Sequence, residues 1–190
     1  MKTLLHICCA PCSVACVDVL RKENIDFDGF WYNPNIQPFT EYNNRRNALI
    51  EFAQNERFDL IADDEYNLKQ FAKNTAPNFT DRCSFCYDMR LSRAAEYAKN
   101  NGYDSFTSTL FISPYQNHDL MKDIAEKYAK KFDIEFLYRD FRPYFTEGQN
   151  KARELGLYMQ KYCGCVFSEE ERYLKKIDKI TGVNYFKNKE

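Results

Sequence analysis

The sequence predicts an α/β fold in which one parallel β-sheet carries helices on both faces. Short strand-like runs alternate with helix-length segments along most of the chain, and connections of helix length join parallel strands. The chain has 190 residues, of which 44% are hydrophobic and 29% are charged, as in a globular domain with its own core. We therefore expect a single domain over residues 1–182 and a frayed tail at 183–190.

The first half of the chain contains three of the expected strands. Apolar runs predict strands at Thr3–Cys8, Phe27–Tyr32 and Phe58–Ala62. The helices expected between and after these strands cover Ser13–Lys22, Thr40–Asn55 and Leu68–Lys73. Thr40 is the expected N-cap of its helix, because a threonine hydroxyl can accept a hydrogen bond from a free backbone N–H group.

The second half continues the alternation. A helix is expected at Ser84–Asn100, closed by Gly102 in the position that favours glycine. The later elements are strands at Ser105–Phe111 and Ile134–Tyr138, with helices at His118–Phe132, Gly148–Tyr158 and Ser168–Ile180. The full pattern predicts a three-layer, Rossmann-like (nucleotide-hydrolase-like) fold. Sites in such folds lie outside the carboxyl ends of the strands.

Charge and hydropathy give no global signal for a nucleic-acid-binding protein or for a membrane protein. The net charge is −1, so no global field marks a nucleic-acid-binding protein. No run of about 18 apolar residues is present that would span a membrane. The apolar stretch near the N-terminus is too short for a secretory signal. We therefore expect a cytoplasmic protein, in which thiols stay reduced.

The eight cysteines fall into three tight groups. They are Cys8, Cys9, Cys12 and Cys16; then Cys83 and Cys86; then Cys163 and Cys165. In a cytosolic chain of this size, such groups indicate metal ligands or redox-active thiols. The first group follows the first expected strand, so it is expected at the carboxyl edge of the sheet, where a nucleotide-binding protein would carry glycines.

The spacing of the other two groups indicates different chemistry for each. Cys83 and Cys86 form a CxxC motif where a loop enters a helix, and the N-terminus of a helix favours thiolates. Four cysteine thiolates suit either structural zinc or a [4Fe–4S] cluster, and the spacing leaves both open. The CGC motif at 163–165 suits a strained, reducible disulfide better than shared ligation of one tetrahedral ion.

Five sequence blocks together resemble one known family. The blocks LLHICCAPCS, FWYNPNI, RCSFCYDMRL, SPYQNHD and YCGCVFSE run in order from Leu4 to Ser168. They are similar to the QueH family of epoxyqueuosine reductases. The resemblance implies reductive removal of the epoxide oxygen from epoxyqueuosine at the wobble position of tRNA, giving queuosine. It also implies an iron–sulfur cluster and chemistry without cobalamin.

The resemblance implies a role for most of the cysteines. Cluster ligation is assigned to Cys8, Cys9, Cys83 and Cys86, and a redox-active disulfide to Cys163 and Cys165. Cys12 is left over as a candidate ligand for a second metal, a mononuclear iron. Cys16 is expected to be a buried bystander. His118 is a candidate proton donor, whereas His6 is expected to be a satisfied core histidine.

The expected partners are a tRNA anticodon stem-loop carrying epoxyqueuosine and an unidentified electron donor. Tyr87, Tyr115 and Tyr162 flank the cysteine blocks, either as core aromatics or as stacking surfaces for a splayed base. The pair Arg45–Arg46 is expected on a solvated helix face. Candidate phosphate contacts are Arg82, Arg90, Arg93, Arg139 and Arg142.

Two other functions are compatible with the residues. The first is a zinc-stabilised RNA-binding module without catalysis, which would be colourless and contain stoichiometric zinc. The second is a protein thiol oxidoreductase that uses the CGC pair alone and would not need the first two cysteine groups.

Overall fold

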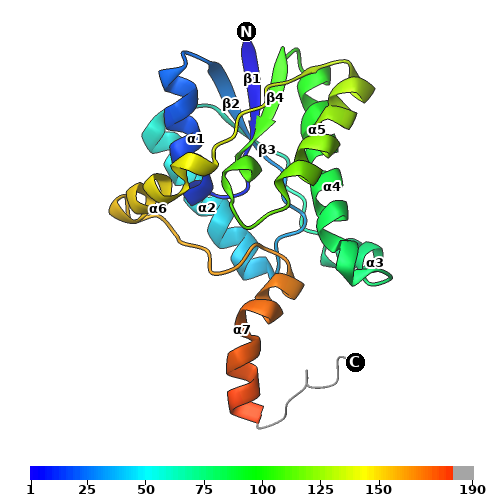
Figure 1. Ribbon diagram of the computed structural model, residues 1–190. Helices are drawn as coiled ribbons and strands as arrows, with labels where there is room; N and C mark the ends of the chain where they lie inside the picture. Colours follow the sequence, from blue (N-terminus) through cyan, green and yellow to red (C-terminus); the bar gives the residue numbers. More distant parts are fainter. Residues whose placement is uncertain (182–190) are drawn as a thin grey trace.

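A five-stranded parallel sheet forms the centre of the molecule, with the strand order β3-β2-β1-β4-β5. The computed structural model describes residues 1–181 (Figure 1). The strands are β1 (Lys2–His6), β2 (Asp26–Trp31), β3 (Leu60–Ala62), β4 (Ser105–Ser108) and β5 (Glu135–Phe136). The sequence-based prediction of a parallel α/β fold is confirmed.

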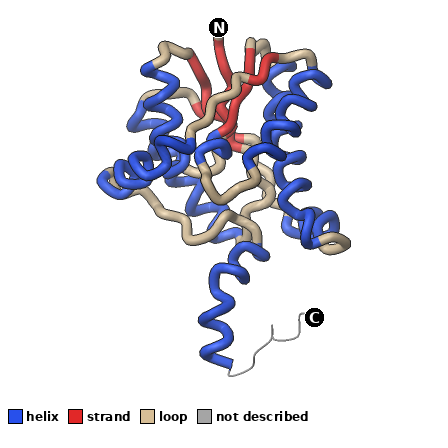
Figure 2. The backbone as a smooth tube through the Cα atoms, in the orientation of Figure 1, coloured by secondary structure: helices blue, strands red, loops and turns tan. Residues whose placement is uncertain are grey.

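The described part of the chain contains seven α-helices. They are α1 (Ala10–Lys22), α2 (Phe39–Glu56), α3 (Leu68–Thr75), α4 (Arg82–Asn100), α5 (His118–Phe132), α6 (Phe145–Glu154) and α7 (Val166–Thr181). Helix α1 packs against α6 and α2, whereas α4 packs against α5, β1 and β4 (Figure 2). Helix α7 leads away from the carboxyl edge of the sheet (Figure 1).

Strand β1 is the central strand, and this explains its apolar sequence. Leu4 pairs with Asp28 of β2 on one side and with Phe106 of β4 on the other. Leu4 and Leu5 are completely buried. A central parallel strand is covered on both faces, so two adjacent residues that point to opposite faces, Leu4 and Leu5, are both apolar. Strands β2 and β3 lie on one side of β1, and β4 and β5 lie on the other, so β1 borders the topological switch point of the sheet. The first cysteine group follows this strand directly.

Several predicted boundaries are wrong by a few residues. Strand β1 ends before Cys8, and α1 begins at Ala10, which places Cys12 inside the first turn of the helix. Thr40 is not a cap, since α2 already starts after Pro38. The predicted helix at 148–158 instead covers Phe145–Glu154.

The predicted strand at Ser105–Phe111 is shorter for a clear reason. Ser108 accepts a hydrogen bond from the backbone N–H of Leu110 through its hydroxyl, and residues Thr109–Ile112 form a 3₁₀ turn. This local bond withdraws the backbone from the sheet ladder.

No helix within residues 1–181 is both long enough and apolar enough to cross a membrane. The frayed tail expected at 183–190 lies outside the described residues.

Candidate metal centre

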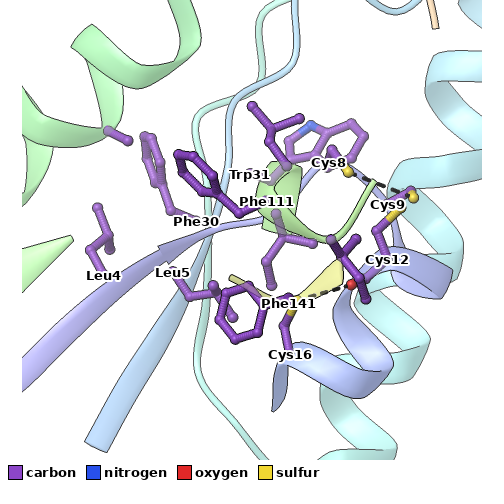
Figure 3. Packing of buried hydrophobic residues seen from close by; sticks show 14 of the residues in the cluster. Leu4, Leu5, Cys8, Cys9, Cys12, Cys16, Phe30, Trp31, Phe111 and Phe141 are labelled. Atoms are coloured by element: carbon purple, nitrogen blue, oxygen red, sulfur yellow. Dashed lines mark hydrogen bonds between the residues drawn. The ribbon is translucent and has the colours of Figure 1, made fainter. Parts of the chain in front are cut away.

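The first cysteine group occupies the turn between β1 and α1. The Sγ atoms of Cys8 and Cys9 are 3.8 Å apart (Figure 3). The Sγ atoms of Cys8, Cys9 and Cys12 all lie within 4.8 Å of one another, and all three residues are buried. We call these three residues the sulfur triad. Cys9 is the N-cap of α1, so the triad lies at the positive end of a helix dipole, where thiolates are stabilised.

Hydrogen-bond donors from distant parts of the chain surround the sulfur triad. Thr109 donates its hydroxyl to Cys8 Sγ over 3.4 Å. Gln160 donates its side-chain N–H to Cys9 Sγ over 3.0 Å and to Cys12 Sγ over 3.6 Å. Hydrogen bonds from the Cys12 and Cys9 thiols hold the pKa of Cys8 well below its usual value. Burial raises the pKa of Cys9, and hydrogen bonds to Cys8 and Cys9 raise the pKa of Cys12. Of the three sulfurs, that of Cys8 therefore carries negative charge most readily.

Cys16 lies one helical turn beyond the sulfur triad. It is fully buried and donates its thiol to the carbonyl of Cys12 over 3.3 Å (Figure 3). Burial raises its pKa well above the usual value. This confirms the expectation that Cys16 is a buried thiol.

The second cysteine group lies in the first turn of α4. Cys83 is exposed and Cys86 is buried. The buried Arg90 donates one N–H to Cys86 Sγ and another to its carbonyl, each over 3.2 Å. Desolvation raises the pKa of Cys163, and the positive charge of Arg90 partly offsets this rise. Arg90 also adds to the lowering of the pKa of Cys8, which comes mainly from the hydrogen bonds of Cys12 and Cys9. Arg90 is therefore a common cationic neighbour of all three cysteine groups.

The third group is present as two free thiols, so the expected disulfide between Cys163 and Cys165 is not formed. The backbone of Gly164, which joins them, is held on both sides. Its N–H donates to Ser168 Oγ over 3.1 Å, and its carbonyl accepts from the N–H of Gln37 over 2.8 Å. These two hydrogen bonds fix the backbone conformation of the CGC motif, and no disulfide constrains it. Cys165 instead packs with Cys86 in a small apolar cluster.

The structure distributes the predicted ligands unevenly. Among the described residues, the three sulfurs that meet at one point are those of the sulfur triad. Cys83 and Cys86 lie outside that group, and Cys12 belongs to it. Arg90 and the cluster around Cys165 nevertheless connect the α4 cysteines with the other two groups.

The two histidines have different surroundings. His6 is fully buried, with Nδ1 2.8 Å from Ser108 Oγ and Nε2 3.1 Å from the carbonyl of Tyr32. This confirms its expected core role. His118 starts α5 behind its N-cap Asn117, and its Nε2 lies 3.0 Å from the hydroxyl of Tyr138. Its proton-donor role stays a prediction.

The aromatic and basic candidates also differ from one another. Tyr87 is buried, and Tyr162 is half-buried and donates its hydroxyl to the carbonyl of Gln37, whereas Tyr115 is 85% exposed. Arg90 is buried against Cys86. The other predicted phosphate contacts are paired with carboxylates: Arg82 with Glu171, Arg93 with Asp63, Arg139 with Glu23, and Arg142 with Asp140. An approaching phosphate would compete with these carboxylates.

Sequence reasoning missed four side chains at this site, namely Glu41, Arg45, Thr109 and Gln160. Arg45 was expected on a solvated face, but it is only 2% exposed and pairs with Glu41. The spacing of four residues between the two was an available signal. Thr109 and Gln160 contact the sulfurs, yet nothing in the sequence near either residue distinguishes it from other polar residues.

The sequence spanning all three cysteine groups matches a known family. Residues 3–171 match the family model described as "Epoxyqueuosine reductase QueH". The chain belongs to this family. The QueH match includes β1, the sulfur triad, the start of α4 and the CGC motif, so it covers the whole candidate centre.

Individual QueH relatives agree with the family match over most of their length. A protein of Dehalococcoides mccartyi named epoxyqueuosine reductase QueH is 40% identical over 174 residues, covering 92% of this chain and 96% of the relative. A protein of the same name from Thermotoga maritima is 36% identical over 180 residues, covering 89% and 91%.

Two solved structures share the fold at low sequence identity. The U34-tRNA thiolase NcsA from Methanococcus maripaludis, solved with its [4Fe-4S] cluster, has a TM-score of 0.57 at 15% identity, covering 95% of this chain and 67% of the other. A predicted tRNA methyltransferase subunit from Methanocaldococcus jannaschii has a TM-score of 0.53 at 10% identity, covering 81% and 76%. These similarities support the Rossmann-like arrangement of the sheet.

Proposed function

We propose that this protein reduces epoxyqueuosine to queuosine at the wobble position of tRNA. The observation that carries the proposal is the family match over residues 3–171, which includes all three cysteine groups. The reaction converts an epoxide to an alkene and releases its oxygen as water, which takes two electrons and two protons. The site therefore needs a source of electrons and a route for protons.

The donor set fits an iron–sulfur cluster. Three buried sulfurs lie within 4.8 Å of one another, and Thr109 and Gln160 donate hydrogen bonds to them. Hydrogen bonds to sulfur and nearby positive charge stabilise an anionic cluster. We assign the ligands as Cys8, Cys9, Cys83 and Cys86, with Cys12 beside them for a mononuclear iron. A bound cluster would supply electrons singly.

Cys163 and Cys165 supply the second redox element of the proposal. Both are free thiols, which is the reduced state of a dithiol pair. Oxidation of the pair to a disulfide releases two electrons and two protons, which balances the reduction of one epoxide. An external donor must then reduce the disulfide again.

The proposed substrate is an anticodon stem-loop and not a free nucleoside. Tyr115 is 85% exposed and contacts the ring of Phe145 edge-on, with centroids 5.8 Å apart. An exposed, supported aromatic ring offers a stacking surface for an unstacked base. Binding is expected to weaken as salt rises, because phosphate contacts release counterions.

Metal analysis of cysteine variants tests the ligand assignment. Protein purified without oxygen is expected to be brown, and Cys86→Ser is expected to lose most of its iron and its activity. Cys163→Ser and Cys165→Ser are expected to lose turnover with iron and colour intact. Cys12→Ser should keep the four cluster irons. A colourless parent protein with stoichiometric zinc would overturn the proposal in favour of a structural zinc module.

A further inference from the structure

A short segment near the end of the described chain crosses over α2 before it reaches the CGC motif. We call residues 158–165 the CGC segment. Arg45 of α2 is 2% exposed and donates to two consecutive carbonyls of this segment. One N–H reaches the carbonyl of Cys163 over 2.8 Å, and another reaches that of Tyr162 over 2.9 Å. The guanidinium therefore holds the backbone on which Cys163 is carried.

The orientation of Arg45 is itself fixed. Its Nε donates to Oε1 of the buried Glu41 over 2.7 Å. The other oxygen of Glu41 accepts the hydroxyl of Tyr158, which begins the CGC segment. The ring of Tyr162 lies 5.6 Å from the guanidinium carbon of Arg45. Both ends of the segment are thus tied to one ion pair on α2.

The CGC segment also brings the side chain of Gln160 to the candidate centre. Gln160 lies between the two tied ends and donates to Cys9 and Cys12. Gly164 lies so close to α2 and the preceding loop that an added Cβ would be 3.3 Å from Ile36 and 3.5 Å from Arg45. The position of the segment therefore sets both the Gln160 contact and the place of the CGC thiols.

We propose that Arg45 is a positioning residue that holds the CGC segment over the sulfur triad. This proposal rests on the proposed redox role of Cys163 and Cys165. A buried ion pair contributes little net stability because desolvation offsets its attraction. What Arg45 supplies is geometry, since its planar fork can satisfy two carbonyls and one carboxylate together. A lysine at the same place has one point charge and cannot do so.

Arg45→Lys tests this, with the neighbouring Arg46→Lys as the matched control. Arg46 pairs with Asp64 at the surface and does not touch the CGC segment. In the iron-loaded protein, Arg45→Lys is expected to keep its iron and to accelerate alkylation of the buried Cys165 about tenfold, because the segment opens more often. The kcat is expected to fall about tenfold with KM unchanged, because a misplaced thiol affects the reaction more than binding. Arg46→Lys should match the parent in all three measurements.

The outcomes separate this proposal from the proposed function. Alkylation of Cys165, followed by mass spectrometry, needs no substrate, so it decides the positioning role even if the parent shows no reductase activity. Parent-like alkylation in Arg45→Lys overturns the proposal, and so does loss of iron in that variant. If Arg45→Lys does not fold, Tyr158→Phe replaces it, because this change removes only the hydroxyl that holds Glu41. Faster Cys165 alkylation in Tyr158→Phe supports the proposal, and an unchanged rate overturns it.

Discussion

Gln160 is a single side chain that links the chain's last cysteine group with its first. Its N–H group donates to two sulfurs of the triad, and hydrogen bonds to sulfur make an iron–sulfur cluster easier to reduce. Gln160→Leu is therefore expected to lower the reduction potential of the proposed cluster by on the order of 100 mV, the one-electron equivalent of one hydrogen bond to a charged group. Spectroscopic titration of the iron-loaded protein measures this shift.

An exposed glutamine provides the control for Gln160. Gln70 lies on the surface of α3, and Gln70→Leu makes the same chemical change away from the sulfurs. Its potential should equal that of the parent. A Gln160→Leu protein with the parent potential would show that this amide does not act on the cluster.

At the scale of single residues, the sequence located the thiols but not their neighbours. Spacing alone grouped the cysteines, because CxxC and CxC patterns are short-range features. In the sequence Arg45 looked like its half-buried neighbour Arg46, but Arg45 is buried against the carbonyl of Cys163, which lies 118 positions later. Gln160 owes its role to the same long-range contact. Side chains recruited by distant segments leave no local pattern in the sequence.

The contact between α1 and α6 has a glycine at its closest point. A Cβ added at Gly148 would lie 2.8 Å from the Cβ of Ala15. Gly148→Ala is therefore expected to lower the free energy of unfolding by about 1–2 kcal/mol, because overpacking exceeds the gain of about 1 kcal/mol in helix propensity. Urea unfolding measures the change.

A swap of the two residues tests the cause of this destabilisation. The double variant Ala15→Gly with Gly148→Ala moves the missing methyl group to the other helix. It should be more stable than the sum of the two single changes predicts, because the close contact is relieved. If the stability changes of the two single variants simply add, the loss of stability comes from helix propensity and not from packing.

At the scale of elements, helices were predicted more accurately than strand ends. The helix at His118–Phe132 was placed correctly, because its amphipathic pattern and the Asn117 cap are local signals. The strand expected at Ser105–Phe111 was too long, since the residues after Ser108 are apolar but form a 3₁₀ turn. In a buried parallel sheet, apolar runs continue past the end of the ladder, so hydropathy does not mark where a strand stops.

Across the whole molecule, both histidines of the chain are buried, and this gives stability a defined pH dependence. Burial lowers the pKa of His6 to about 4 and that of His118 below its usual value. The unfolded chain takes up these protons near pH 6.5, whereas the folded protein does not. The free energy of unfolding is therefore expected to fall between pH 6.5 and pH 4, by about 2 kcal/mol at pH 5 for His6 alone.

Proton NMR of the metal-free, reduced protein checks this assignment directly. The imidazole signal of His6 should stay unshifted between pH 8 and pH 5, and His118→Gln identifies which signal belongs to which residue. A midpoint near 6.5 for His6 would contradict the prediction.

The three cysteine groups lie far apart in the chain and converge only in the folded protein. During synthesis the ribosome releases the triad first, the α4 cysteines next and the CGC segment last, and domains generally fold from the N-terminal side as they emerge. Arg45 has no backbone carbonyl of Tyr162 or Cys163 to bind until that last segment is made. A nascent chain that ends before residue 158 would therefore lack the CGC segment that lies over the sulfur triad, and Gln160 with it. The sulfur triad is consequently most accessible after the sheet has formed and before the last segment has docked.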